Sequence, residues 1–226
     1  MGTDWVPGAR LAGSRIIEAE PPADAPVVGV LALQGDVLEH LRALAEAGAR
    51  PVRVRSLADL DSVDGLVIPG GESTTIGMLL DRAGMLHVLR GRAEDGMPMF
   101  GTCAGLILLS RELAQERLQH LIGVLDVTTR RNAFGRQVDS FETDLTVVGM
   151  DRAIPAVFIR APWIERVGAE VDVLASVGDH AVLVSQGHLL AASFHPELTG
   201  DRRLHAMFVD RVRDAVGRRG AARAAR

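Results

Sequence analysis

Residues 98–110 read Pro98-Met-Phe-Gly-Thr-Cys-Ala-Gly-Leu-Ile-Leu-Leu-Ser110 and hold Cys103, the only cysteine of the 226-residue chain. The apolar run before Gly101 predicts a strand and the run after Gly105 predicts a helix, with Cys103 on the tight turn between them. Flanking glycines permit such a bend. The start of a helix favours a thiolate through its free N–H groups and its dipole. A lone cysteine is most often an inert core residue, but this frame indicates a nucleophile.

A second segment, Ser193-Phe-His-Pro-Glu197, supplies a candidate base at the end of the apolar run Leu189–Ala192. If the run continues as an extended strand, His195 and Glu197 point to the same side. A carboxylate beside an imidazole fixes its tautomer and stabilises the imidazolium. Alone, such a histidine would be read as a surface residue at a strand end. Six histidines lack this context and are expected to be mostly surface residues: His40, His87, His120, His180, His188 and His205.

A third segment combines a buried-strand pattern with a double glycine, in Gly65-Leu-Val-Ile-Pro-Gly-Gly-Glu-Ser-Thr-Thr75. Acyl transfer through a tetrahedral oxyanion needs two N–H donors, and glycine lets the backbone approach a ligand closely. We expect these donors to be the N–H groups of Gly71 and of Ala104. A Pro-Gly-Gly sequence is usually only a turn, so this prediction depends on its place at a strand end ahead of the cysteine.

Taken together, these motifs resemble those of class I glutamine amidotransferases, and more narrowly those of the family of glutaminase subunits of pyridoxal 5′-phosphate synthase. The resemblance runs in order from about Val27 to about Val216, and the segment Met1–Pro26 departs from it. The motifs that carry it are Val30–Gly35, Pro69–Thr75, Gly101–Leu106, Arg131–Gln137, Asp139–Glu142, Phe158–Pro162 and Ser193–Thr199.

The resemblance implies hydrolysis of L-glutamine to glutamate and ammonia through a thioester on Cys103, with His195 as base and Glu197 orienting it. It implies no cofactor and no metal. The ammonia would pass to a barrel-shaped synthase subunit that makes pyridoxal 5′-phosphate, in a large hetero-oligomer. Two of the implied substrate contacts are arginines, which suit the α-carboxylate of glutamine, although a surface ion pair is the ordinary role of an arginine. The implied glutamine contacts are Gly71, Glu72, Ser73, Arg131, Ile159 and Arg160.

Short apolar strands alternate with amphipathic helices in the first half of the chain, which predicts an α/β fold with a mostly parallel sheet. The family resemblance adds that the fold has three layers, with helices on both faces of the sheet. The stretch from Val124 to Ser193 is richer in strands and is expected to extend the sheet in antiparallel fashion. The predicted elements are strands at Val27–Leu33, Pro51–Val54, Leu66–Ile68, Asp144–Val148, Ala156–Ile159, Val171–Val177 and Ala181–Ser185, and helices at Val37–Ala47 and Arg203–Val216.

The chain is expected to hold one glutaminase domain at residues 27–216, between a disordered extension at 1–26 and a disordered basic tail at 217–226. The net charge of −4 gives no reason to expect nucleic acid or a membrane as partner. One cysteine excludes an internal disulfide framework and suits a reducing cytoplasm. We find no apolar stretch of membrane-spanning length and no signal-peptide pattern.

Two other functions remain open at this stage. One is another cysteine hydrolase of the same fold, such as a γ-glutamyl hydrolase or the glutaminase of a different biosynthetic complex; the Arg131–Gln137 motif argues against it. The other is a non-catalytic regulatory module, which the joint presence of Cys103, His195 and Glu197 disfavours. The stretch Arg131–Glu142 is expected near both the glutamine pocket and the docking face, although an ordinary hairpin at Phe134, Gly135 and Arg136 is the alternative that the sequence leaves open.

Overall fold

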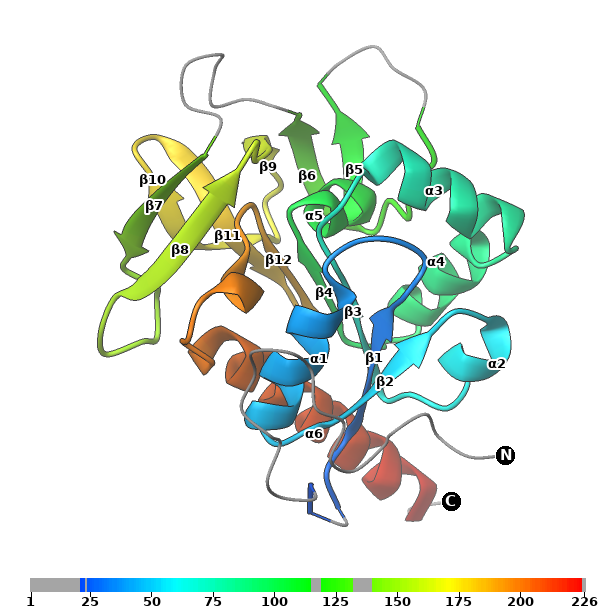
Figure 1. Ribbon diagram of the computed structural model, residues 1–226. Coiled ribbons are helices and arrows are strands. Elements are labelled where there is room, and N and C mark those ends of the chain that lie inside the picture. The colour runs from blue at the N-terminus through cyan, green and yellow to red at the C-terminus, as the bar shows by residue number, and fades with distance from the viewer. Residues whose placement is uncertain (1–20, 23, 115–118, 132–139, 225–226) are drawn as a thin grey trace.

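One mixed sheet organises the chain (Figure 1), in a computed structural model that describes residues 21–22, 24–114, 119–131 and 140–224. Within these residues ten strands pair in the order β2-β1-β3-β4-β12-β11-β9-β6-β5, with β10 beside β11. The first five strands of this order run parallel, and β11, β9 and β6 are antiparallel neighbours. The strands are β1 (Val27–Leu31), β2 (Arg50–Val54), β3 (Gly65–Ile68), β4 (Met99–Thr102), β5 (Ser110–Leu113), β6 (Leu125–Arg130), β9 (Trp163–Val167), β10 (Asp172–Val177), β11 (His180–Gln186) and β12 (Leu189–Ala192).

Helices cover both faces of this sheet because successive strand residues point to opposite sides. On one face Val30 packs in a buried cluster with Leu44 of α1 and Phe208 of α6. On the other face Leu31 packs in a cluster with Ile76 of α3 and with α2, α4 and α5. Figure 1 shows α1 and α6 on one side of the sheet and α3 and α4 on the other. The helices are α1 (Val37–Glu46), α2 (Leu57–Leu60), α3 (Ser73–Arg82), α4 (Leu86–Glu94), α5 (Ala104–Leu109), the 3-10 helix η1 (Pro196–Leu198) and α6 (Arg203–Ala224).

Two strands, β7 (Ser140–Leu145) and β8 (Ile154–Ile159), form a separate antiparallel pair. The alternate residues Ile154, Ala156 and Phe158 are buried against the cluster that contains α1 and α6. This pair therefore packs over the sheet instead of extending it.

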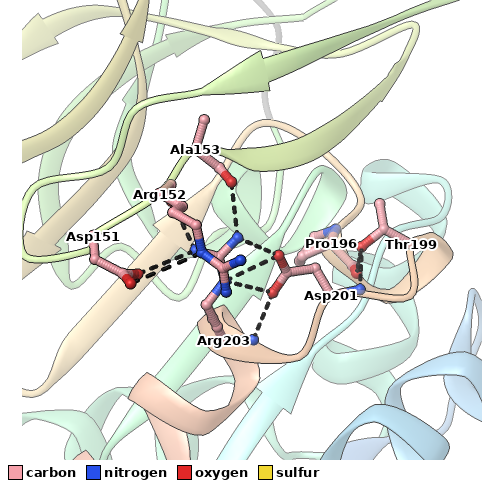
Figure 2. Close-up of polar contacts among 7 residues, drawn as sticks. All are labelled: Asp151, Arg152, Ala153, Pro196, Thr199, Asp201 and Arg203. Carbon is pink, nitrogen blue, oxygen red and sulfur yellow. Dashed lines mark hydrogen bonds and ion pairs between the residues drawn. The ribbon is translucent and has the colours of Figure 1, made fainter.

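A polar cluster ties the β7–β8 connection to the start of α6 (Figure 2). The Arg203 guanidinium donates to the carbonyl oxygens of Arg152 at 2.7 Å and Ala153 at 2.8 Å. Its Nε also donates to the Asp201 carboxylate at 3.0 Å. The loop that follows η1 is thereby fixed to the small sheet.

The α/β prediction, with a parallel half, an antiparallel extension and helices on both faces, is confirmed. Three details are wrong. The strand expected at Asp144–Val148 lies at Ser140–Leu145, and its sheet is separate from the main one. Helix α6 continues to Ala224 where a disordered tail was expected from Gly217, because alanine and arginine both favour a helix.

The third wrong detail is the start of the ordered domain. Ala25 is buried, and the Pro26 carbonyl accepts the Arg50 N–H at 2.9 Å, so the last residues of the supposed disordered extension belong to the domain. Residues 1–20 and 23 of that extension lie outside the described residues. Among the described helices, none is both long enough and apolar enough to cross a membrane.

Candidate active site

The nucleophile turn has the predicted strand–turn–helix form. Strand β4 ends at Thr102 and α5 begins at Ala104, while Cys103 between them has φ +48° and ψ −101°. A positive φ is unusual for a residue with a side chain and marks a strained position. The Cys103 N–H donates to Ala192 O at 2.8 Å, which fixes the turn to the end of β12. Cys103 is buried, with 8 % of its surface exposed.

Close backbone packing explains the glycines around Cys103. A Cβ on Gly101 would lie 2.5 Å from the carbonyl carbon of Gly105, and a Cβ on Gly105 would lie 2.0 Å from the carbonyl oxygen of Ile68. Neither contact can be relieved by moving a flexible side chain. The turn closes onto β3 only because both positions lack a side chain.

His195 and Glu197 meet as predicted, but not for the predicted reason. Strand β12 ends at Ala192, and Glu197 lies in the 3-10 turn η1 instead of an extended strand. The His195 Nδ1 and Glu197 Oε1 atoms are 2.7 Å apart. The His195 N–H donates to Val157 O of β8 at 2.8 Å, so the small sheet holds the backbone of this segment. Proline at the first position of the turn prevents continuation of the strand and produces the local fold.

The charges of this cluster favour a protonated imidazole. Burial lowers the pKa of His195, but hydrogen bonds to Cys103 and Glu197 and the charges of these groups outweigh burial and raise this pKa to about 10. Burial raises the pKa of the Glu197 carboxyl, against the bond and charge of His195. With a 2.7 Å bond between them, the shared proton resides on His195. An imidazolium–carboxylate pair of His195 and Glu197 is therefore stable here.

The double glycine passes between His195 and the Gln34 side chain. A Cβ on Gly70 would lie 2.4 Å from His195 Cε1, and a Cβ on Gly71 would lie 2.5 Å from Gln34 Oε1. Gly71 has φ +147°, which a residue with a side chain rarely adopts. Gln34 Oε1 also accepts the Glu72 N–H at 2.8 Å. The segment expected to supply an oxyanion donor thus lies directly against His195.

Two of the predicted substrate contacts, Glu72 and Arg131, pair with each other. Glu72 caps α3 by accepting the N–H groups of Thr74 at 3.1 Å and Thr75 at 2.7 Å, and Arg131 Nη2 donates to it at 2.8 Å. Burial raises the pKa of Glu72, but hydrogen bonds from Thr75 and Thr74 outweigh burial and lower this pKa to about 2. The result is a half-exposed pair of opposite charges at the start of α3.

The remaining predicted contacts lie on two elements. Ser73 is buried at the first residue of α3, and its hydroxyl has no hydrogen-bond partner within the described residues. Ile159 is the partly exposed last residue of β8, the strand that binds the His195 backbone. Arg160 follows with φ +43°, and among the described residues only Cys103 shares a positive φ without being glycine. Strained backbone of this kind is concentrated at functional sites.

Sequence reasoning missed three polar groups at this site. The sequence assigns no separate role to Gln34 or Asp36, and it groups His40 with histidines expected to be mostly at the surface, although His40 is fully buried. Asp36 Oδ2 lies 3.5 Å from His195 Nδ1. The only sequence signal is that Gln34 lies in the motif Val30–Gly35 and that Asp36 and His40 follow it closely. Asp36, His195 and Glu197 have ligand atoms within 4.8 Å of one another, but the hydrogen bond between His195 and Glu197 explains this geometry without a metal ion.

Comparison with known proteins agrees with this geometry. Residues 30–214 match the model of the SNO glutamine amidotransferase family. The chain belongs to this family. A protein of Nocardia farcinica named pyridoxal 5′-phosphate synthase subunit PdxT is 58 % identical over 212 residues, which are 89 % of this chain and 93 % of that protein. A protein of the same name from Parafrankia sp. is 60 % identical over 195 residues, 85 % of this chain and 96 % of its own length.

Solved structures give the same result. A crystal structure described as a glutamine amidotransferase superposes with a TM-score of 0.79 at 50 % identity, covering 82 % of this chain and 98 % of that one. A putative GMP synthase component from Thermoplasma acidophilum superposes with a TM-score of 0.61 at 18 % identity, covering 88 % of this chain and 98 % of that one. The second comparison supports the fold alone.

We expect Gly105→Ala to lower the melting temperature and to impair Cys103 chemistry, because the added Cβ would press on the Ile68 carbonyl at 2.0 Å. Overpacking of this kind typically costs ~1–3 kcal/mol or more. The matched control is Gly91→Ala in α4, where a Cβ would meet nothing within 4 Å. Alanine should stabilise that helix by ~0.5–1 kcal/mol. Thermal unfolding of both variants measures this, and equal stability would contradict the close packing.

Proposed function

We propose that this chain hydrolyses L-glutamine to L-glutamate and ammonia and delivers the ammonia to a synthase subunit that makes pyridoxal 5′-phosphate. The observation that carries the proposal is the succession of Cys103, His195 and Glu197. Cys103 has a strained backbone at the start of a helix and is hydrogen-bonded to His195, which is in turn bonded to the buried Glu197 carboxylate. Membership of the SNO family and the PdxT name of the relatives support the same reaction and partner.

The proposed reaction uses these groups in order. The Cys103 thiolate attacks the side-chain carbonyl of glutamine, and the N–H groups of Gly71 and Ala104 stabilise the resulting oxyanion. The His195 imidazolium protonates the leaving nitrogen, so ammonia departs and a thioester remains. His195 then takes a proton from water, which hydrolyses the thioester to glutamate. Glu197 keeps the imidazole oriented throughout.

The half-exposed pair of Glu72 and Arg131 suits recognition of the glutamine backbone. Glutamine carries an ammonium and a carboxylate on its α-carbon, so each can replace one partner of this ion pair while the total charge stays balanced. Arg160 supplies a second guanidinium near the end of β8, and Ser73 and Ile159 line the same region in the proposal. Arginine pairs well with a carboxylate because its planar N–H groups match the two oxygens.

The proposed partner is a barrel-shaped synthase subunit in a hetero-oligomer, which would receive ammonia without loss to water. The relatives are named as subunits of such a synthase, which supports a partner of this kind. We place the reaction in the cytoplasm, because the free thiol of Cys103 must stay reduced to act as a nucleophile.

Cys103→Ala should abolish ammonia release from glutamine while leaving thermal unfolding close to that of the parent chain. The reason is that no other thiol exists in the sequence to replace it. Ammonia is measured with the synthase partner present. Near-normal release by this variant would remove Cys103 as the nucleophile.

His195→Asn should be almost as damaging as loss of the thiol, and Glu197→Gln should be milder. His195 transfers protons itself, and such help is typically worth ~10²–10⁴-fold in rate. Glu197 acts only through His195. The comparison of kcat for the two variants decides the roles, and a more severe effect of the Glu197 change would reverse them.

The chain alone should be a slow glutaminase that its synthase partner activates. The Gly70 carbonyl accepts the Asp36 N–H over a long 3.4 Å, and neither glycine carries a side chain, so the peptide unit between Gly70 and Gly71 can turn over at little cost. In the wrong orientation it removes an oxyanion donor, which typically costs ~10²–10³ in rate. A partner that binds the productive orientation better would shift the population.

The measurement for this activation is ammonia release at saturating glutamine, with and without excess synthase partner, using Cys103→Ala as the background. Equal rates in the two conditions would exclude activation by the partner.

A further inference from the structure

Two buried histidines lie behind Glu197 and have no part in the reaction described above. His40 of α1 and His205 of α6 are both fully buried. Their positions in the sequence differ by 165, but the two rings are neighbours in the fold. His40 Nδ1 is 3.1 Å from His205 Nε2. On its other side, His40 Nε2 is 3.0 Å from Thr102 Oγ1 and 3.4 Å from Glu197 Oε2. A continuous polar path therefore runs from α6 through α1 to the catalytic carboxylate.

Both imidazoles are neutral and held firmly. Burial keeps the pKa of His40 well below its usual value; the repulsion that would arise if His205 were protonated as well, and the charge of His195, act in the same direction. Burial and the nearby Arg202 charge lower the pKa of His205 to about 3. The Phe100 ring packs edge-on against both, with ring centroids 6.5 Å from His40 and 5.9 Å from His205.

The positions of two atoms without partners decide which nitrogens carry the protons. Within the described residues, Glu197 Oε2 and His205 Nδ1 are buried without a hydrogen bond. If His40 carried its proton on Nδ1, its Nε2 lone pair would face the Glu197 carboxylate, and His205 would bury an unpaired N–H. In the other tautomer His205 Nε2–H donates to His40 Nδ1, His40 Nε2–H faces Glu197, and only a lone pair on His205 stays unpaired. An unpaired buried N–H is the rarer and costlier defect, so the second tautomer is favoured.

We propose that His40 is a positioning residue for the glutaminase reaction, with its Nε2–H shared between Thr102 Oγ1 and Glu197 Oε2 and its tautomer fixed by His205. The inference rests on the proposed function. Glu197 then has a donor on each oxygen: His195 on Oε1 and His40 on Oε2. A buried carboxylate with a hydrogen-bond donor at each oxygen keeps its negative charge and its orientation. Both are needed to hold His195 as an imidazolium.

The charged and titratable groups around this site fix the direction of the effect. Facing the cluster are His195 and Cys103 on the catalytic side, Asp36 on the loop before α1, and His205 on α6. Loss of the His40 N–H should let Glu197 hold a proton more readily. His195 would then lose its negative partner, and the Cys103 thiolate would lose its positive one. Formation of the thiolate should consequently require a higher pH.

The test is the rate of Cys103 alkylation by iodoacetamide as a function of pH, on the full-length chain without a partner. Because the chain has a single cysteine, the reaction reports this site alone. The variants are His40→Leu, which removes the donor, and His40→Gln, whose side-chain amide can place an N–H near the position of Nε2. The control is His87→Leu, which changes an exposed histidine on α4.

His40→Leu should shift the acidic limb of the alkylation profile upward by about one pH unit, as expected for loss of a hydrogen bond to a charged group. His40→Gln should recover most of this shift, and His87→Leu should match the parent chain. With the synthase partner present, His40→Leu should lower kcat for glutamine about tenfold or more and leave KM nearly unchanged. A profile unmoved by His40→Leu, or a Gln variant as impaired as Leu, would overturn the proposal.

If His40→Leu does not fold, His205→Leu tests the same path, because it frees His40 to change tautomer without removing its ring. A smaller shift in the same direction is expected, and no shift would overturn the proposal. The alkylation assay needs no glutamine. A parent chain that is alkylated normally at Cys103 but releases no ammonia with its partner would therefore count against the glutaminase function. The effect of His40 on Cys103 would still be decided by the alkylation profile.

Discussion

The Cys103 N–H donates to the carbonyl of Ala192 over 2.8 Å, and this bond joins the two strand ends that lead to Cys103 and to His195. It continues the parallel pairing of β4 with β12, in which Thr102 lies opposite Ala192. The register matters because a shift by one residue would turn every side chain of the strand to the other face. With the register fixed, the residues that follow each strand emerge at the same edge of the sheet. The 91 residues between Cys103 and His195 then need only return the chain to this edge.

Local geometry explains which parts of the site could be predicted from the sequence. The turn at Cys103 needs only neighbouring residues: a strand, glycines at 101 and 105 and an apolar helix, so the pattern was sufficient. The pairing of His195 with Glu197 was also predicted, but from strand alternation, whereas proline begins a 3-10 turn there. Both geometries bring residues two positions apart together. The correct pair thus followed from an incorrect local structure.

The contact between the buried histidines His40 and His205 could not be predicted from the sequence. His40 precedes an apolar stripe on α1, and His205 lies among the apolar residues of α6, so each alone resembles an ordinary polar residue on an amphipathic helix. They become a pair only because α1 and α6 pack on the same face of the sheet. The separate β7–β8 sheet has the same origin. The strand pattern was visible, but nothing local distinguishes a strand that joins the main sheet from one that packs over it.

The site has a half-exposed side and a buried side, and the free-energy cost of breaking a polar contact differs between them. Glu72 and Arg131 form a partly exposed ion pair, where exchange of one partner for another costs little, and Arg160 is exposed. Glu197, His40 and His205 are withdrawn from water, where an unpaired polar group costs ~1–3 kcal/mol and alternative arrangements are suppressed. Such a division suits a reaction whose substrate must enter and leave while the proton-transfer groups stay in place. In this fold Glu72 at the start of α3 is exposed, whereas His195 is buried and its backbone is bound to β8 of the small sheet.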